Sequence, residues 1–205
     1  MIIEKIWRAF IDYEKEKYLE DEDDKKIHVH DIIRCKYKYY LKKMFPEVTL
    51  PIIPSIFIGE SVDDFVKELA KRIGNLESTE ANIEIKVTID GKEKVLVGRP
   101  DLLFEDCVVE IKYSRDLTDK PLEHHINQLK MYLFMTGKKQ GYLVYITPQG
   151  LREFTIEEQF DANSFKEFIA TWKSPRYDWE CEYCEFRFIC PYRIMPTEND
   201  NKKQS

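Results

Sequence analysis

The residues with the clearest chemical potential are two carboxylates and a lysine in the segment 97–114, VGRPDLLFEDCVVEIKYS. A hairpin that turns at Glu105–Asp106 would set Asp101 opposite Glu110 and Arg99 opposite Lys112. Because side chains alternate across a strand, these four polar side chains would share one face of the hairpin. The opposite face would be an apolar core face made of Leu102, Phe104, Cys107, Val109, Ile111 and Tyr113.

Two directly opposed carboxylates repel each other, and a divalent cation between them removes that cost. Mg²⁺ and Mn²⁺ prefer oxygen ligands and keep several waters, which leaves room for a substrate phosphate and an attacking water. Lys112 projects from the same face, where it could orient or help deprotonate that water and neutralise charge in the transition state. The pattern therefore predicts metal-dependent phosphodiester chemistry. The plain alternative is a solvated edge hairpin with a surface salt bridge.

The hairpin resembles the signature of the PD-(D/E)XK nucleases, because Pro100-Asp101 is followed, after eight residues, by Glu110-Ile111-Lys112.

A second pair of polar residues follows on the expected helix after this hairpin. Gln128 and Tyr132 lie four residues apart and share a helix face, and they resemble the Q-x-x-x-Y motif of the RecB-like branch of these nucleases. The resemblance implies that Gln128 and Tyr132 hold substrate and support the catalytic lysine. Alone, the pair would fit an amphipathic core helix, and His124–His125, one turn earlier, would be exposed or support the site.

The RecB-like pattern also has an upstream G-x-x-x-H motif whose histidine ligates the metal. Here Gly59 begins that spacing, and Asp63 stands where the histidine would be. Aspartate is a good ligand for hard cations, and a set without imidazole favours Mg²⁺ or Mn²⁺ over softer metals. The residues so implied as metal ligands are Asp63, Asp101, Glu110 and Ile111, the last through its main chain. Asp63 as an ordinary acid in a first helical turn, or Glu60 or Asp64 in its place, are the alternatives.

The cysteines form a second constellation. Cys181, Cys184 and Cys190 make a C-x₂-C-x₅-C pattern near the end of the chain, and Cys35 lies far upstream. A C-x₂-C pair with two further cysteines is typical of a thiolate site for Zn²⁺ or an iron–sulfur cluster, and the spacing does not choose between them. Cys107 falls on the core face of the hairpin and is expected to be a plain buried thiol. The alternative is a coincidental grouping of structural cysteines.

The segments around these cysteines, HVHDIIRCKYKYYLKKMFPE and WECEYCEFRFICP, resemble the CRISPR-associated exonuclease family Cas-four, and the likeness covers about residues 28–193. The resemblance implies that Cys35, Cys181, Cys184 and Cys190 hold an iron–sulfur cluster, [4Fe–4S] rather than [2Fe–2S]. The cluster would be a structural clasp between residues 28–46 and 175–193. The resemblance also implies that the protein degrades DNA with Mn²⁺ or Mg²⁺ and that CRISPR integrase proteins are its partners. The protein would belong either to a cellular CRISPR system or to an archaeal virus.

The remaining patterns predict an α/β (α+β) fold, a PD-(D/E)XK core with one mixed sheet flanked by helices. Expected helices span 2–19, 31–44, 60–74, 121–135 and 162–173, and expected strands span 81–90, 94–104, 107–114, 140–148 and 151–159. The segment TLPIIPSIFIGE before residue 61 is expected to be a loop that leads into its helix. Residues 1–195 would form a single nuclease domain, and 196–205 a disordered tail.

Charge limits the function classes. The net charge of −6 argues against a protein that coats nucleic acid through overall charge, but it leaves room for a local basic groove. In RCKYKYYLKK (34–43) lysines alternate with tyrosines, which suits either a phosphate and base contact surface or the outer face of a helix. Without a membrane-length apolar run or a signal peptide pattern, we expect an intracellular, cytoplasmic protein.

The leading hypothesis is a metal-dependent DNA nuclease that prefers single strands, an exonuclease for which endonuclease activity stays open. Its rival is a catalytically degenerate iron–sulfur module that binds DNA or a CRISPR integrase complex, and the missing histidine at Asp63 favours it. A third candidate, a small iron–sulfur electron carrier, leaves the carboxylate hairpin unexplained.

Overall fold

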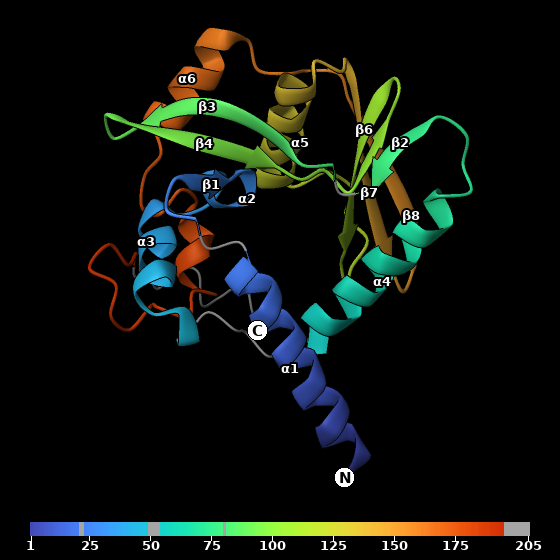
Figure 1. The fold of residues 1–205 in the computed structure, drawn as a ribbon, viewed down its shortest axis with the longest axis horizontal. Coiled ribbons are helices and arrows are strands. Elements are labelled where there is room, and N and C mark those ends of the chain that lie inside the picture. The colour runs from blue at the N-terminus through green and yellow to red at the C-terminus, as the bar shows by residue number, and fades with distance from the viewer. Residues whose placement is uncertain (21–22, 49–53, 80, 195–205) are drawn as a thin grey trace.

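The protein is built on two sheets set at an angle to each other, with one helix packed between them (Figure 1). A computed structural model describes residues 1–20, 23–48, 54–79 and 81–194. The smaller sheet has the order β1 (Lys26–His28), β4 (Lys92–Gly98), β3 (Ile83–Ile89). The larger has the order β2 (Leu76–Thr79), β5 (Leu102–Phe104), β6 (Cys107–Tyr113), β7 (Gln140–Thr147), β8 (Gly150–Ile156). The predicted mixed α and β architecture is confirmed, but it contains two sheets and not one.

The division into two sheets occurs where one long strand was expected. Residues 94–104 do not form a single strand, because β4 ends at Gly98 and β5 begins at Leu102 in the other sheet. Proline lacks an N–H for the strand ladder, so Pro100 interrupts pairing at this point. The bend from Arg99 to Asp101 therefore carries the chain from one sheet to the next.

Strand β6 is covered on both faces. On one face Leu102, Phe104, Val109 and Ile111 pack with Ala70 of α4 (Pro54–Ala70), so the predicted apolar face is confirmed. The hairpin register is also as predicted, with Leu102 paired to Val109. The opposite face is not a solvated polar face, because Val108 and Leu143 lie there in the main core against helix α5 (Glu123–Thr136).

Helix α5 lies unusually close to the larger sheet. A Cβ atom at Gly141 of β7 would come within 2.8 Å of the Leu129 side chain, so glycine permits this approach. The helix ends as predicted, with Gly137 in the left-handed conformation at φ 71°. The close packing carries the polar residues of α5 directly onto β6 and sets the geometry of the site.

The other helices differ from expectation at their ends. The helix expected at 31–44 is divided into α2 (Val29–Ile32) and α3 (Lys36–Met44). The break exists because the main-chain N–H groups of Cys35 and Lys36 donate to Glu180 Oε1 and to the Lys173 carbonyl, at 2.9 and 3.0 Å. Helix α4 begins at Pro54, six residues earlier than expected, since proline suits the first turn of a helix.

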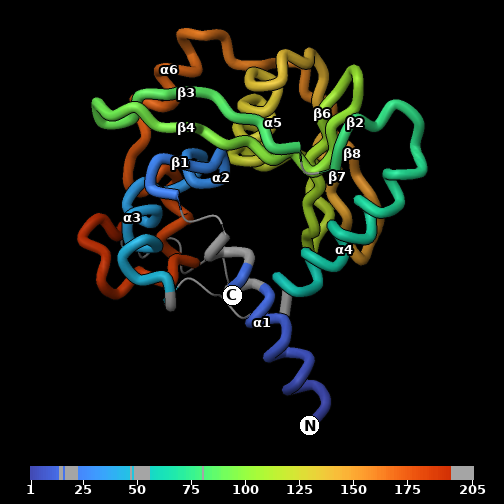
Figure 2. The backbone as a smooth tube through the Cα atoms, viewed as in Figure 1, coloured from blue at the N-terminus to red at the C-terminus, as the bar shows by residue number. Residues whose placement is uncertain are grey.

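The C-terminal part of the chain returns to the N-terminal part. Helix α6 (Ala162–Ala170) leads into the short 3₁₀ helix η2 (Asp178–Cys181), and Figure 2 shows this red end beside the blue helix α3. Ser174 Oγ accepts the main-chain N–H of Tyr37 at 2.6 Å, and Lys38 Nζ lies 2.7 Å from Glu185 Oε2. The Lys38–Glu185 contact joins the two expected clasp segments, and the Tyr37–Ser174 contact reaches the residue directly before the second one.

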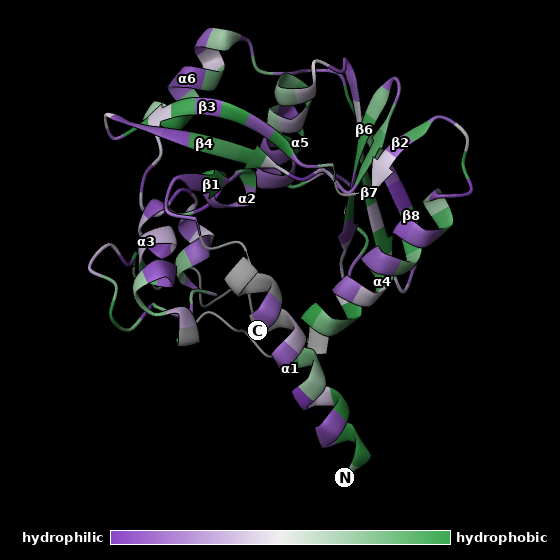
Figure 3. Cartoon of the chain, in the orientation of Figure 1, coloured by the Kyte–Doolittle hydropathy of each residue, from purple (hydrophilic) through white to green (hydrophobic). Residues whose placement is uncertain are grey.

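Helix α1 (Ile2–Glu20) extends from the body of the molecule (Figure 1), and hydrophobic and hydrophilic residues are interleaved along it (Figure 3). Its Phe10 ring meets Phe57 of α4 at a centroid distance of 5.2 Å. The short 3₁₀ helix η1 (Pro46–Val48) follows α3. The expected tail at 196–205 and most of the loop expected before α4 lie outside the described residues.

Of the helices that the structure describes, none combines the length and the apolar character that crossing a bilayer requires.

Candidate active site

The structure brings together the polar residues that the sequence singles out, from four elements. Strand β6 supplies Glu110 and Lys112, helix α5 supplies Gln128 and Tyr132, the bend before β5 supplies Asp101, and helix α4 supplies Asp63. Direct contacts link neighbouring members of this set, and the charge of Asp63 acts on the carboxyl of Glu110.

Glu110 is the centre of the hydrogen-bond network and is only 2% exposed. Its Oε1 accepts from Gln128 Nε2 at 2.7 Å and from Lys112 Nζ at 2.5 Å. The same Gln128 nitrogen donates to the Tyr132 hydroxyl at 3.0 Å, so these two residues do share a face. Gln128 thus holds the carboxylate that binds the lysine. Among the described residues, Glu110 Oε2 has no hydrogen-bond partner.

Asp101 reaches the site by a different geometry from the one expected. The β5–β6 ladder stops at Leu102 and Val109, so Asp101 is not a cross-strand partner of Glu110. It lies in the bend after Pro100, where its Oδ2 accepts the main-chain N–H of Ile111 at 2.6 Å. The expectation that Arg99 faces Lys112 is wrong, because Arg99 is exposed and follows β4 of the other sheet.

Ile111 contributes to the site only through its main chain. Its side chain is 6% exposed and lies in the apolar cluster beneath α4. In β6 it pairs with Val144 of β7, and its N–H is the donor to Asp101. The residue therefore fixes the Asp101 carboxylate whether or not its carbonyl oxygen binds an ion.

Asp63 lies on α4 beside a lysine that the sequence reasoning missed. Lys67, one helical turn later, bonds Asp63 Oδ2, and its Nζ lies 3.8 Å from Asp101 Oδ1. The four-residue spacing of Asp63 and Lys67 was the available signal. Within the described chain, Asp63 Oδ1 is buried and has no hydrogen-bond partner. Lys67 therefore lies between two carboxylates that the resemblance assigns to a metal.

Burial and mutual repulsion raise the pKa values of these carboxylates. Burial, with the charge of Glu110 adding to it, raises the pKa of Asp101 to about 7. Burial and then Asp101 raise the pKa of Asp63 to about 6. Burial also raises the pKa of Glu110, and Lys112 opposes this. Clustered acids with raised pKa values are a frequent property of functional sites.

Lys112 keeps its proton in this environment. Burial works against its charge, but Glu110 and Asp101 outweigh that effect and raise the pKa of the ammonium group. A lysine with a raised pKa is a poor base for a water molecule at neutral pH. Of the two roles the sequence suggests, the structure favours neutralisation of negative charge.

The donor set suits a hard divalent cation. All its side-chain donors are carboxylate oxygens, and one oxygen each of Asp63 and Glu110 is buried without a partner in the described chain. However, in the described ranges no group of three or more His, Cys, Asp or Glu side chains is arranged to hold a metal ion. The ammonium groups of Lys67 and Lys112 lie against these acids and supply the compensating charge.

The two histidines at the start of α5 are not exposed. His124 is 7% exposed, and His125 is half-buried with its Nδ1 2.7 Å from the Tyr145 hydroxyl. Burial, then the charges of Arg34 and Lys112, lower the pKa of His124 to about 3. Burial and Lys112 likewise lower the pKa of His125 to about 2, so both rings are neutral.

The four cysteines of the expected cluster line one small pocket. Cys35 comes from the segment between α2 and α3, and Cys181, Cys184 and Cys190 come from the C-terminal segment. Cys107 is apart from them in β6 and is only partly buried, and burial raises its thiol pKa to about 11. None of the five cysteines forms a disulfide. In the described part of the chain these thiols are not arranged as a three-ligand metal group.

Glu180 organises the cysteine pocket, and no local pattern in the sequence indicates this role. This buried carboxylate accepts the main-chain N–H groups of Cys35, Arg176 and Tyr177 at 2.9, 2.9 and 3.0 Å. The partners of its Oε1 and Oε2 come from both ends of the chain, and Cys35 is 145 residues away. Such a contact has no local spacing from which it could be predicted.

Comparison with known proteins identifies the family. The chain is 31% identical over 183 residues to the CRISPR-associated exonuclease Cas4 of Saccharolobus solfataricus, covering 84% of this chain and 90% of that protein. The chain belongs to the Cas4 family. No family model matches it.

Solved structures agree with this assignment. The crystal structure of SSO0001 matches with a TM-score of 0.84 and 30% identity, over 95% of this chain and 98% of that one. An alkaline exonuclease from Laribacter hongkongensis matches with a TM-score of 0.50 and 18% identity, over 70% of this chain and 81% of that one. The second likeness concerns the fold alone. The predicted family and fold are both confirmed.

The raised pKa of Asp101 leads to a prediction about the metal-free protein. An unfolded aspartate ionises near 3.8 and the folded one near 7, so this carboxyl destabilises the fold increasingly as pH rises between these values. Asp101→Asn keeps an oxygen acceptor for the Ile111 N–H and removes the charge. We expect it to raise the melting temperature at pH 8 by about 3 °C or more. The gain should shrink as pH falls to 5.

Differential scanning calorimetry of chelator-treated protein at the two pH values measures this effect. Asp106→Asn, which neutralises an exposed acid at the tip of the same hairpin, is the control and should change little. A lower melting temperature for Asp101→Asn at pH 8 than for the unmodified protein would contradict the electrostatic account.

Proposed function

We propose that the protein is a metal-dependent DNA exonuclease that acts preferentially on single strands. The observation that carries the proposal is the buried Glu110 carboxylate, held by Gln128 and Lys112 beside Asp101 and Asp63. Its membership of the Cas4 family and 31% identity to a named exonuclease support the reaction type. The preference for single strands comes from the family resemblance and needs its own test.

The oxygen donors of this site would hold Mg²⁺ or Mn²⁺. We assign the ligands to Asp63, Asp101, Glu110 and the main-chain carbonyl of Ile111. The ion, when bound, polarises the scissile phosphate and lowers the pKa of a bound water. Asp63 takes the ligand position for which the related pattern has histidine, and its buried unpartnered oxygen supports that assignment.

The protein's own groups prepare the site for a phosphodiester. Gln128, fixed by Tyr132, orients Glu110 and limits the carboxylate to one position. Lys112 Nζ stays protonated and lies 2.5 Å from Glu110, where it can neutralise charge that develops on the phosphoryl oxygens. Lys67 offers a second ammonium group beside Asp63 and Asp101.

The first test removes the catalytic ammonium group. Lys112→Ala should lower the rate of Mn²⁺-dependent cleavage by about 10²- to 10³-fold, because preorganised charge stabilisation of a transition state has about that value. End-labelled single- and double-stranded DNA would be digested with the two proteins in parallel. Lys130→Ala removes a lysine of α5 that is paired to Glu158 and not to the acids of the site, and this variant should cleave as the unmodified protein does.

Two outcomes contradict the proposal in different ways. Equal cleavage by Lys112→Ala would place the catalytic site elsewhere. Absence of metal-dependent cleavage by the unmodified protein would favour the DNA-binding or adaptor module.

We also propose an iron–sulfur cluster on Cys35, Cys181, Cys184 and Cys190, [4Fe–4S] in form and structural in role. Its support is that all four thiols line one pocket although Cys35 lies far from the others in sequence. Such a clasp closes a loop of well over a hundred residues, and a cross-link of a ~100-residue loop is worth about 4.7 kcal/mol in the entropic model.

Analysis of metal and sulfide tests the cluster directly. Protein purified anaerobically should contain iron and acid-labile sulfide in equal amounts, and Cys184→Ser should lose both. Cys107→Ser is the matched control, because this thiol lies in β6 and not in the pocket, and it should keep full iron. Stoichiometric zinc without iron would overturn the assignment.

The name of the related exonuclease also suggests which proteins this chain acts with. We propose that it acts on DNA with CRISPR integrase proteins, since the related exonuclease is described as CRISPR-associated. Co-purification with such an integrase from the same source would test this association.

A further inference from the structure

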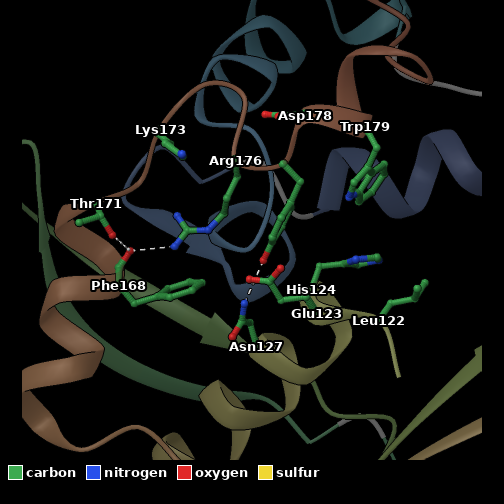
Figure 4. Close-up of a pocket in the computed structure, with 11 residues that line it drawn as sticks. Leu122, Glu123, His124, Asn127, Phe168, Thr171, Lys173, Arg176, Asp178 and Trp179 are labelled. Carbon is green, nitrogen blue, oxygen red and sulfur yellow. Dashed lines mark hydrogen bonds between the residues drawn. The ribbon is translucent and has the colours of Figure 1, made fainter. Parts of the chain in front are cut away.

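Trp179 is a partly exposed aromatic residue that neither the metal site nor the cysteine pocket uses. It lies in η2, two residues before Cys181, and its side chain is 41% exposed. It lines two adjoining hollows. One has a volume of about 1180 Å³ and is also lined by His124, Asn127 and Tyr177 (Figure 4). The other, of about 320 Å³, is lined by residues of α2 and α3.

The indole is held in place by its neighbours. The guanidinium carbon of Arg34 lies 5.0 Å from the ring centroid, a cation–π arrangement. The rings of His124 and Tyr177 lie 5.0 and 6.1 Å away, the latter almost parallel to the indole at 13°. Asn127 Nδ2 donates to the Tyr177 hydroxyl at 2.9 Å, which fixes that ring. The result is a preorganised aromatic platform with an open cavity beside it.

The platform adjoins the candidate active site. His124 is in the first turn of α5, four residues before Gln128, and packs against Trp179. The positive charges of Arg34 and Lys112 both act on His124, and Arg34 acts on Lys112. Arg34, which lies over the indole of Trp179, is therefore within electrostatic range of Lys112.

Positive charge on α3 and its surroundings contributes little to DNA binding. The net charge is −6, and three lysines of α3 already have acidic partners, with Nζ to carboxylate distances of 2.6 Å for Lys36, 2.7 Å for Lys38 and 2.9 Å for Lys43. The basic helix expected from the sequence is therefore largely neutralised by the protein itself. Stacking of a base on an aromatic ring is worth more than a screened surface contact and tolerates any sequence.

The occupant that fits is an unpaired nucleobase. The larger hollow exceeds the ~300 Å³ at which ligand pockets begin, so a nucleotide can enter it. An indole flanked by a neutral imidazole offers a flat apolar surface, and a base in a duplex has no free face to place on it. We propose that Trp179, supported by Arg34, His124 and Tyr177, stacks one nucleobase of single-stranded DNA next to the scissile phosphate. This inference rests on the proposed function for its substrate class.

Binding measured without cleavage tests the platform. Full-length protein, purified anaerobically and assayed without added divalent metal, would be titrated into a fluorescein-labelled single-stranded oligonucleotide, with anisotropy as readout. Trp179→Ala should weaken binding by about 5- to 100-fold, and Trp179→Phe, which keeps an aromatic face, should recover most of the affinity. Phe188→Ala removes a more exposed aromatic residue that lines neither hollow, and it should bind as the unmodified protein does.

An abasic scan locates the stacked base. A single abasic site moved along the oligonucleotide should weaken binding of the unmodified protein most at one position. Trp179→Ala should be insensitive to the abasic site at that position, because the two changes remove the same contact. Equal binding by Trp179→Ala, or equal abasic sensitivity in both proteins, would overturn the proposal.

The outcomes also separate this proposal from the proposed function. Trp179-dependent binding without metal-dependent cleavage would sustain the platform and defeat the nuclease assignment. Cleavage with Trp179-independent binding would do the reverse. An absence of oligonucleotide binding by the unmodified protein would overturn the platform and leave the hollow to a protein partner.

Discussion

The burial of Glu110 is the constraint on which the rest of the structure depends. A carboxylate that is 2% exposed costs several kcal/mol in desolvation unless hydrogen bonds and opposite charge offset it. Two donors converge on its Oε1, one from α5 and one from β6 itself. The donor from α5 is within reach only because Gly141 lets that helix approach the sheet closely. The acid thus requires the tight helix–sheet packing that surrounds it.

Burial also explains why the cluster of acids lowers the stability of the fold when no cation is bound. Asp63, Asp101 and Glu110 each have a raised pKa, and two lysines are needed to compensate their charge. Proteins retain such destabilising clusters where function needs them. The cysteine pocket also depends on a buried carboxylate, because Glu180 accepts main-chain N–H groups from both chain ends. Arg34 links the N-terminal part of the chain to the C-terminal part, since its carbonyl accepts Trp172 Nε1 at 2.7 Å and its guanidinium lies over Trp179.

The periodicity of strands and helices predicts part of the fold and part of the candidate site. The register of the β5–β6 hairpin and the shared face of Gln128 and Tyr132 follow from strand and helix periodicity, and the structure has both. The place of Asp101 does not follow from periodicity, because Pro100 ends the ladder and turns the backbone before the acid. The break before α3 and the role of Glu180 depend on a contact across 145 residues, which no local pattern records. Lys67 was missed because an ion pair along a helix is common and rarely functional.

The central claim is that these carboxylates are held together to bind a divalent ion, and calorimetric titration of the metal-free protein with Mn²⁺ tests it most directly. We expect one Mn²⁺ site at the acids, and binding there should release protons near pH 6.5, because carboxyls with pKa values of about 6 and 7 must ionise to coordinate the ion. Affinity should fall as pH is lowered from 7.5 to 5.5, and Glu110→Gln should abolish binding at this site. Equal Mn²⁺ affinity in Glu110→Gln and the unmodified protein would contradict the account.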